Sequence, residues 1–250
     1  MFHNFIFLPL YNGLIGIMDI LPGVDVGVAV IIFTIIIRLI LFPLSKSSVL
    51  TQVRMKEVEP EANKIRAEYA TDKQTQALKI MELYKTRKVR PFSGVLLMFI
   101  QLPILIALIS VFYKIIPTID PTYLYSFIHV PVIKPTLLGM DLTSKSLVLA
   151  IITAIIQFLQ MHFSLASKPA AGSNMIVDQN NRAAMPSSAQ MSNMMTTQMK
   201  WFLPIIAFVS VYWIIPATYP QAAAVIAIYW SVSSLFTLFQ EIYIRKKHIH

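Results

Sequence analysis

The sequence has no cysteine and few charged residues. None of its 250 residues is a cysteine, which excludes disulfides, thiolate metal sites and a lipid-modified cysteine. Charged residues make up 13% of the chain, about half of what is typical of a soluble domain, whereas 56% are hydrophobic. The mean hydropathy is +0.64. This composition predicts an integral membrane protein.

The residue patterns of membrane enzymes and proton-coupled transporters are also missing. No Asp or Glu lies deep in an apolar run, the five histidines lack metal-ligand spacing, and no serine has an obvious general base. Only His162, near the end of an apolar run, could serve a proton relay. We therefore expect no enzyme activity, no metal and no cofactor.

Five apolar runs are long enough to cross a bilayer. They cover approximately residues 26–44, 95–116, 147–166, 201–217 and 222–244. We therefore predict an all-α integral membrane protein with five transmembrane helices in a core of residues 25–244. Residues 1–24 have no basic start and no cleavage site, and prolines and glycines interrupt them, so we expect an N-terminal interfacial segment.

Lysine and arginine are distributed unevenly between the segments that connect these runs. Residues 46–90, 167–200 and the tail from Arg245 together carry 17 of them, whereas residues 1–25 and 114–146 carry 3. The positive-inside rule then places the N-terminus outside and the C-terminus in the cytoplasm.

Three of the polar segments are expected in the cytosol. Residues 46–90 carry 11 basic and 6 acidic residues and are rich in helix formers, with a break at "ATD" where Asp72 is a candidate helix cap. We predict a cytosolic helical hairpin there, which is either a solvated connector or a docking surface. Residues 167–199 predict a largely disordered cytosolic loop, and residues 245–250 a short basic tail.

Arg38 lies inside the first apolar run, in "IIFTIIIRLILFPL". The next basic residue is Lys46, eight positions on, so Arg38 sits about 12 Å deeper along a helix. Burying it there costs about 3 kcal/mol on insertion scales. Because no intramembrane carboxylate can pair with it, a hydrated cavity open to the cytosolic side accounts for Arg38 better than dry packing does.

Other polar residues of the apolar runs fall on helical faces. Thr153, Gln157, Gln160 and Ser164 share one face, and the run from Tyr229 to Glu241 carries a second polar face. Such residues should face one another or water, either as contacts between helices or as the lining of a groove. The candidate groove residues are Arg38, Thr34, Gln101, Gln157, Gln160, Trp230, Ser233, Ser234 and Gln240.

Seven stretches of the chain, between about Gly23 and Gln240, carry a family resemblance. They are "IIIRLILFPLS", "EVEPEANKIRAEYATDKQTQALKIMELYKTRKVRPFSG", "FIQLPILIALISVFY", "LLGMDLT", "FLQMHFS", "WFLPIIAFVSVYWIIPATYP" and "AIYWSVSSLFTLFQ". In this order they resemble motifs of the YidC/Oxa/Alb family of membrane protein insertases. Arg38, Gln101, Gln160, Trp230 and Gln240 fall on the family's positions.

The resemblance implies a five-span bundle in the bacterial plasma (inner) membrane, around a hydrophilic groove that is open to the cytosol and to lipid. We expect the short form, without a large extracytosolic domain. Nascent membrane proteins would be its clients, which enter the groove and release their apolar segments sideways into the bilayer.

The resemblance also suggests partners. The ribosome, the signal recognition pathway and the Sec translocon are candidate partners of the hairpin, membrane lipids surround the bundle, and no direct contact with nucleic acid is expected. Two alternatives remain: a small channel or solute transporter that uses the same polar cavity, and a purely structural assembly subunit.

Overall fold

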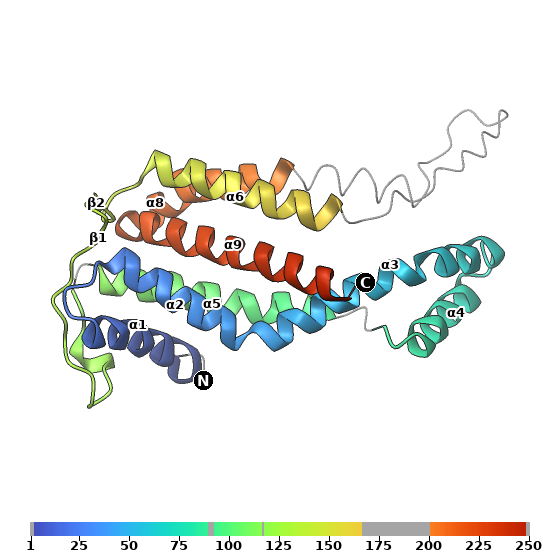
Figure 1. Cartoon of the computed structure of the whole chain (residues 1–250), viewed down its shortest axis with the longest axis horizontal. Coiled ribbons are helices and arrows are strands. Elements are labelled where there is room, and N and C mark those ends of the chain that lie inside the picture. The colour runs from blue at the N-terminus through green and yellow to red at the C-terminus, as the bar shows by residue number, and fades with distance from the viewer. Residues whose placement is uncertain (1–2, 90–92, 117, 167–200, 249–250) are drawn as a thin grey trace.

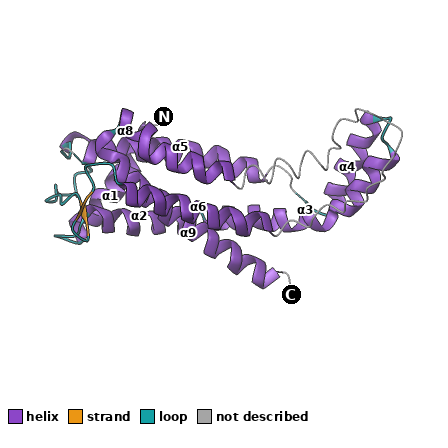
Figure 2. Ribbon diagram, turned by 90° about the horizontal axis from the view of Figure 1, so that it is seen from above, coloured by secondary structure: helices purple, strands orange, loops and turns teal. Residues whose placement is uncertain are grey.

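The described chain is a bundle of long helices with a two-helix projection at one end (Figure 1). The computed structural model describes residues 3–89, 93–116, 118–166 and 201–248. Figure 2, turned by 90°, shows the projection at the end of the bundle opposite a small two-stranded sheet. We refer to these ends as the hairpin end and the strand end.

The first helical segment packs along the second. A π-turn, η1 (His3–Phe7), leads into α1 (Leu8–Ile20), which runs antiparallel beside α2 (Val26–Ile40) (Figure 1). Gly13 permits this approach, because a Cβ there would lie 2.9 Å from Cε2 of Phe33. The segment also packs on α5. The expectation that it lies at the membrane interface stays a prediction.

The first apolar run, residues 26–44, bends near Pro43. α2 ends at Ile40, and α3 (Phe42–Glu68) leaves it at an angle of 59°. Proline has no N–H to continue the helical hydrogen bonds, which accounts for a break at this point. The predicted span of residues 26–44 is therefore a helix that is straight only as far as residue 40.

The predicted helical hairpin is observed. α3 is followed by α4 (Lys73–Thr86), and the two helices pack on each other. Asp72 caps α4 as predicted: its carboxylate accepts hydrogen bonds from the backbone N–H groups of Gln74 and Thr75, at 3.1 and 3.0 Å.

A long connection at the strand end joins the next two helices. The elements in order are α5 (Ser93–Ile115), a 3₁₀ turn η2 (Pro121–Tyr123), the strands β1 (Thr136–Leu137) and β2 (Met140–Asp141), and α6 (Leu147–Ala166). The strands pair antiparallel. The buried Asn12 of α1 fixes this connection, since its side chain donates to the Tyr123 carbonyl and accepts from the Tyr125 N–H.

The last described part of the chain contains the central helix of the bundle. The helical stretch Trp201–Thr218 ends in a π-turn, η3 (Ser210–Ile214), and α8 (Ile215–Thr218); η4 (Pro220–Ala222) and α9 (Ala223–His248) follow. α9 contacts α2, α3, α5 and α6. In the most apolar part of the candidate span Pro220–Lys247, which contains α9, 67% of the residues are buried. The corresponding share is 17% for each of the two other candidate spans, so α9 is the central helix of the bundle.

All five predicted spans coincide with helices, although not every one of these helices is long and apolar enough to cross a membrane by itself. Within the described residues, three helices are long and apolar enough to cross a membrane, and the bent pair of α2 and α3 makes a fourth if it counts as one span. α5 contributes the shorter apolar stretch Gln101–Ile115. The expectation of a mostly helical chain with several candidate membrane spans is thus confirmed, whereas the count of five spans stays a prediction.

The apolar core occupies the strand-end half of the bundle. It brings together buried side chains of α1, α2, α5 and the first two turns of α9, among them Leu14, Val30, Leu108, Phe112 and Ile226. Towards the hairpin end, the buried residues of α9 include serines, a glutamine and a glutamate. The interior of the bundle therefore changes from apolar to polar along α9.

Candidate functional site

Polar residues from three helices meet one short stretch of α9. Tyr229, Trp230, Ser233 and Ser234 lie within about one and a half turns of this helix, and their spacing points them towards different neighbours. We call these four residues and their partners on α2, α5 and α6 the polar band. It lies where the apolar core ends, because Tyr229 is the last residue of α9 whose side chain belongs to the buried core.

Arg38 joins the polar band from α2. Its Nε donates a hydrogen bond to Oγ of Ser233 at 2.7 Å, and its Nη2 contacts the same hydroxyl. The side chain is half-buried, and it forms no ion pair with any described residue. The guanidinium carries five donors, so a single serine leaves most of its hydrogen-bonding capacity unused.

Gln157 joins the band from α6. Its Oε1 accepts hydrogen bonds from Nε1 of Trp230 at 3.1 Å and from Oγ of Ser234 at 3.0 Å. A carbonyl oxygen has two lone pairs, so these two donors saturate it. The contact fixes the indole and the hydroxyl against α6, and the amide NH₂ of Gln157 has no partner among the described residues.

Gln101 joins the band from α5. Its Nε2 donates to the hydroxyl of Tyr229 at 3.1 Å, and the Tyr229 ring packs on the ring of Phe112 with centroids 6.2 Å apart. The tyrosine thus has one side in the apolar core and its hydroxyl in the polar band. The polar face predicted for the run from Tyr229 to Glu241 includes Tyr229, which is not one of the candidate groove residues.

Three candidate groove residues lie outside the polar band. Thr34 is fully buried, and its hydroxyl donates to the Val30 carbonyl of its own helix at 2.6 Å. Gln240 donates to the Phe42 carbonyl at 3.4 Å, beside the bend between α2 and α3. Gln160 has a buried Oε1 that finds no partner among the described residues. The other six candidates meet in the band.

Two further polar contacts join α6 to α9. The hydroxyl of Thr153 lies 2.9 Å from that of Ser231, deep in the bundle. Nearer the hairpin end, the buried Glu241 accepts from Ser164 and pairs with Arg245 one turn later. Helical spacing predicts the polar face of α6, and the expectation that it faces polar residues is confirmed for Thr153, Gln157 and Ser164 but not for Gln160. The Glu241–Arg245 pair was not anticipated, although the i, i+4 spacing of opposite charges was a readable signal.

The polar band offers hydrogen bonding and positive charge at the edge of an apolar interior. Among the described residues, guanidinium donors of Arg38 and the amide donor of Gln157 have no partner, and such donors suit carbonyl and carboxylate acceptors. An extended polypeptide carries such acceptors on every residue. The donors of the band are thus of the chemical kind that pairs with the carbonyl groups of an extended polypeptide.

Comparisons with known proteins agree with the sequence motifs. A family model described as "60Kd inner membrane protein" matches residues 17–250. A membrane protein insertase YidC of Fusobacterium nucleatum is 31% identical over 221 residues, which are 88% of this chain and 86% of that protein.

Two further relatives are similar over less of their own length. Membrane protein insertase YidC 1 of Lactococcus lactis is 30% identical over 86% of this chain and 66% of its own length. Membrane protein insertase YidC of Clostridium tetani is 36% identical over 55% of this chain and 56% of its own length.

Proposed function

Because this chain belongs to the YidC/Oxa/Alb family of membrane protein insertases, we propose that it inserts nascent membrane proteins through the polar band. A polar segment of the client enters between the helices from the hairpin end and meets Arg38 and the amides at the edge of the apolar core. The client's apolar segment then moves sideways into lipid.

The contact of Arg38 with Ser233 is the observation that carries this proposal. An arginine in an apolar helix costs about 3 kcal/mol on insertion scales, and no described carboxylate offsets that cost. A structural role alone would be served by an uncharged residue. The charge is therefore kept for a partner that no described residue supplies, and an acidic or carbonyl-rich client segment would supply it.

The sharp change from apolar core to polar band also fits this function. A client segment that reaches the band has crossed the hairpin-end half of the bundle, which leaves less hydrocarbon for its polar groups to cross. Desolvation is the main cost of moving a polar chain through a bilayer, so a shorter apolar path lowers the barrier. The driving force is the partitioning of the client's apolar segment, and no nucleotide or metal is needed.

Insertion of a client series that differs only in acidic residues tests the proposal. In vesicles reconstituted with Arg38→Ala, we expect the largest loss for clients with acidic translocated segments and the smallest for uncharged ones. Arg38→Lys should retain most of the activity, because lysine keeps a charge and a donor at similar depth.

Lys134→Ala is the matched control, since it removes the same charge from an exposed position at the strand end. Normal insertion of every client by Arg38→Ala would refute the proposal. The same vesicles should show no ion conductance; a steady conductance would instead favour the channel alternative.

A further inference from the structure

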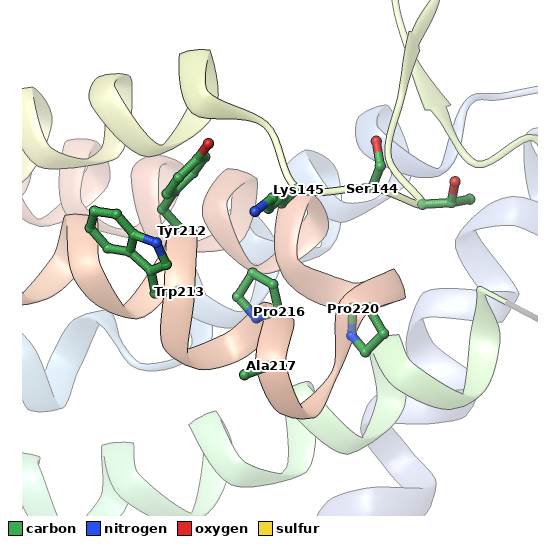
Figure 3. A pocket seen from close by; sticks show the side chains of 8 residues that line it. Ser144, Lys145, Tyr212, Trp213, Pro216, Ala217 and Pro220 are labelled. Atoms are coloured by element: carbon green, nitrogen blue, oxygen red, sulfur yellow. The ribbon is translucent and has the colours of Figure 1, made fainter.

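The strand end of the bundle carries a pocket that the proposed function does not use. It has a volume of about 490 Å³, within the range of roughly 300–1,000 Å³ of small-molecule sites. Its walls come from the loop just before α6 and from η3, α8 and η4 (Figure 3). The polar band lies further along the bundle, beyond the apolar core.

One cation and two aromatic side chains dominate the pocket. In Figure 3 the side chain of Lys145 extends towards Tyr212, with Trp213 and Pro216 beside it. The Lys145 ammonium lies 4.8 Å from the centroid of the Tyr212 ring, a cation–π distance. It forms no ion pair with a described residue.

The nearest acidic residue of the same loop is engaged elsewhere. Asp141 accepts hydrogen bonds from the backbone N–H and the hydroxyl of Thr143, at 2.9 and 2.8 Å, and does not line the pocket. No carboxylate of the described residues thus pairs with Lys145, whose ammonium lies against an aromatic face, and an anion is the ligand that complements it.

The position of the pocket indicates that this anion belongs to a lipid. Lys145 lies two residues before α6, whose residues Leu147–Ser164 form a candidate span. The opposite wall of the pocket belongs to the C-terminal end of the candidate span Trp201–Thr218. Lysine, tyrosine and tryptophan at the ends of spans lie at the depth of lipid headgroups. A soluble anion would not require the mostly apolar wall of Trp213, Pro216 and Ala217.

Exposed apolar side chains continue from the pocket along both helices. Leu147, Val148 and Ile151 of α6 are 48%, 56% and 44% exposed, and Trp213 and Ile214 of η3 are 55% and 57% exposed. An acyl chain that descends from a headgroup in the pocket would cover this surface. The π-turn that carries Tyr212 and Trp213 is itself a feature often found at functional sites.

We propose that this pocket binds one anionic phospholipid, with its phosphate on Lys145 and its acyl chains along α6 and η3. A zwitterionic choline lipid fits less well. Its quaternary ammonium would need an aromatic face, and Lys145 already occupies the face of Tyr212. The bound lipid would link the ends of the two helices at the strand end.

Native mass spectrometry of the full chain in detergent tests this assignment. The delipidated protein is mixed with phosphatidylglycerol and phosphatidylcholine of identical acyl chains. We expect the wild type to retain one phosphatidylglycerol with a roughly fivefold preference, the scale of one lysine at an anionic surface. Lys145→Gln should lose the preference, and Lys145→Arg should keep it.

Lys134→Gln is the control, because it removes an exposed lysine from the same connection but outside the pocket. A second measurement needs no variant at Lys145. Brominated phosphatidylglycerol should quench the fluorescence of Trp213 more strongly than brominated phosphatidylcholine does. The fluorescence of Trp213 is obtained as the difference between the wild type and Trp213→Phe. Equal retention of the two lipids, or an unchanged preference in Lys145→Gln, would overturn the proposal, and so would equal quenching.

Discussion

At the scale of single residues, helical periodicity predicts which face a polar side chain is on but not which partner it finds. The face of α6 was predicted correctly, and Gln157 indeed meets α9. Thr34 shares a face with Arg38, yet its hydroxyl bonds its own helix. The hydroxyl of a threonine in a helix can bond a carbonyl of its own helix or a group on a neighbouring helix. Helix packing decides between the two, and it cannot be read from the sequence.

The contacts of Gln157 lead to a prediction about stability. Gln157→Leu removes the acceptor of both Trp230 and Ser234, and hydrogen bonds between membrane helices contribute about 0.6 kcal/mol each. We expect the free energy of unfolding in mixed micelles to fall by about 1 kcal/mol. Ser110→Ala is the control, because that hydroxyl bonds only the Ile106 carbonyl of its own helix. Equal stability of the two variants would show that the Gln157 contacts contribute nothing.

At the scale of elements, residues that start or stop a helix predict the helix boundaries better than the lengths of the apolar runs do. The Asp72 cap and the break before α4 were predicted from the residues "ATD" and are present. The bend at Pro43 was not predicted, because a proline in the first turn of a helix is equally compatible with a straight entry. The π-turn η3 was also missed, since no sequence signal distinguishes it from ordinary helix.

The cap of α4 leads to a prediction about pH. Hydrogen bonds from Thr75, with a smaller contribution from Gln74, hold the pKa of Asp72 below its usual value of 3.8. A depressed carboxyl pKa stabilises the folded state above the unfolded-state pKa, and this stabilisation is lost as the pH falls through the lower, folded-state value. We expect amide protection in the first turn of α4 to fall below about pH 4.

Two variants of Asp72 distinguish protonation of the helix cap from other effects of low pH on α4. Asp72→Ala should lower that protection at neutral pH, whereas Asp72→Asn should keep the cap and remove its pH dependence, because asparagine caps without titrating. Hydrogen exchange, corrected for intrinsic rates, provides the measurement. An identical pH profile in the wild type and Asp72→Asn would contradict the assigned role.

At the scale of the whole molecule, the fold gathers charge at one end. The basic C-terminal turn of α9, with Arg245, Lys246 and Lys247, ends on the same side as the α3–α4 hairpin (Figure 1). Lys114, Lys134 and Lys145 belong to the strand end. The sequence predicts this division from the uneven count of lysines and arginines in the segments that connect the apolar runs, because consecutive connections between spans emerge on alternate sides.

Single cysteines in this cysteine-free chain test the orientation. Ala77→Cys, on α4, and Ser126→Cys, at the strand end, both replace exposed residues. In sealed cells a membrane-impermeant thiol reagent should label position 126 and not position 77; in inside-out vesicles the pattern should reverse. Leu108→Cys, at a fully buried position, should react in neither. Labelling of position 77 in sealed cells would invert the predicted orientation.

The central claim, that a client passes along the polar band, is tested most directly by photocrosslinking to a ribosome-arrested nascent membrane protein. A photoreactive phenylalanine derivative replaces Trp230 in the band or, as the control, Phe5 of η1, which is 77% exposed and does not belong to the band. We expect adducts from position 230 that depend on nascent-chain length, and few from position 5. Equal adducts at both positions, or none at position 230, would contradict it.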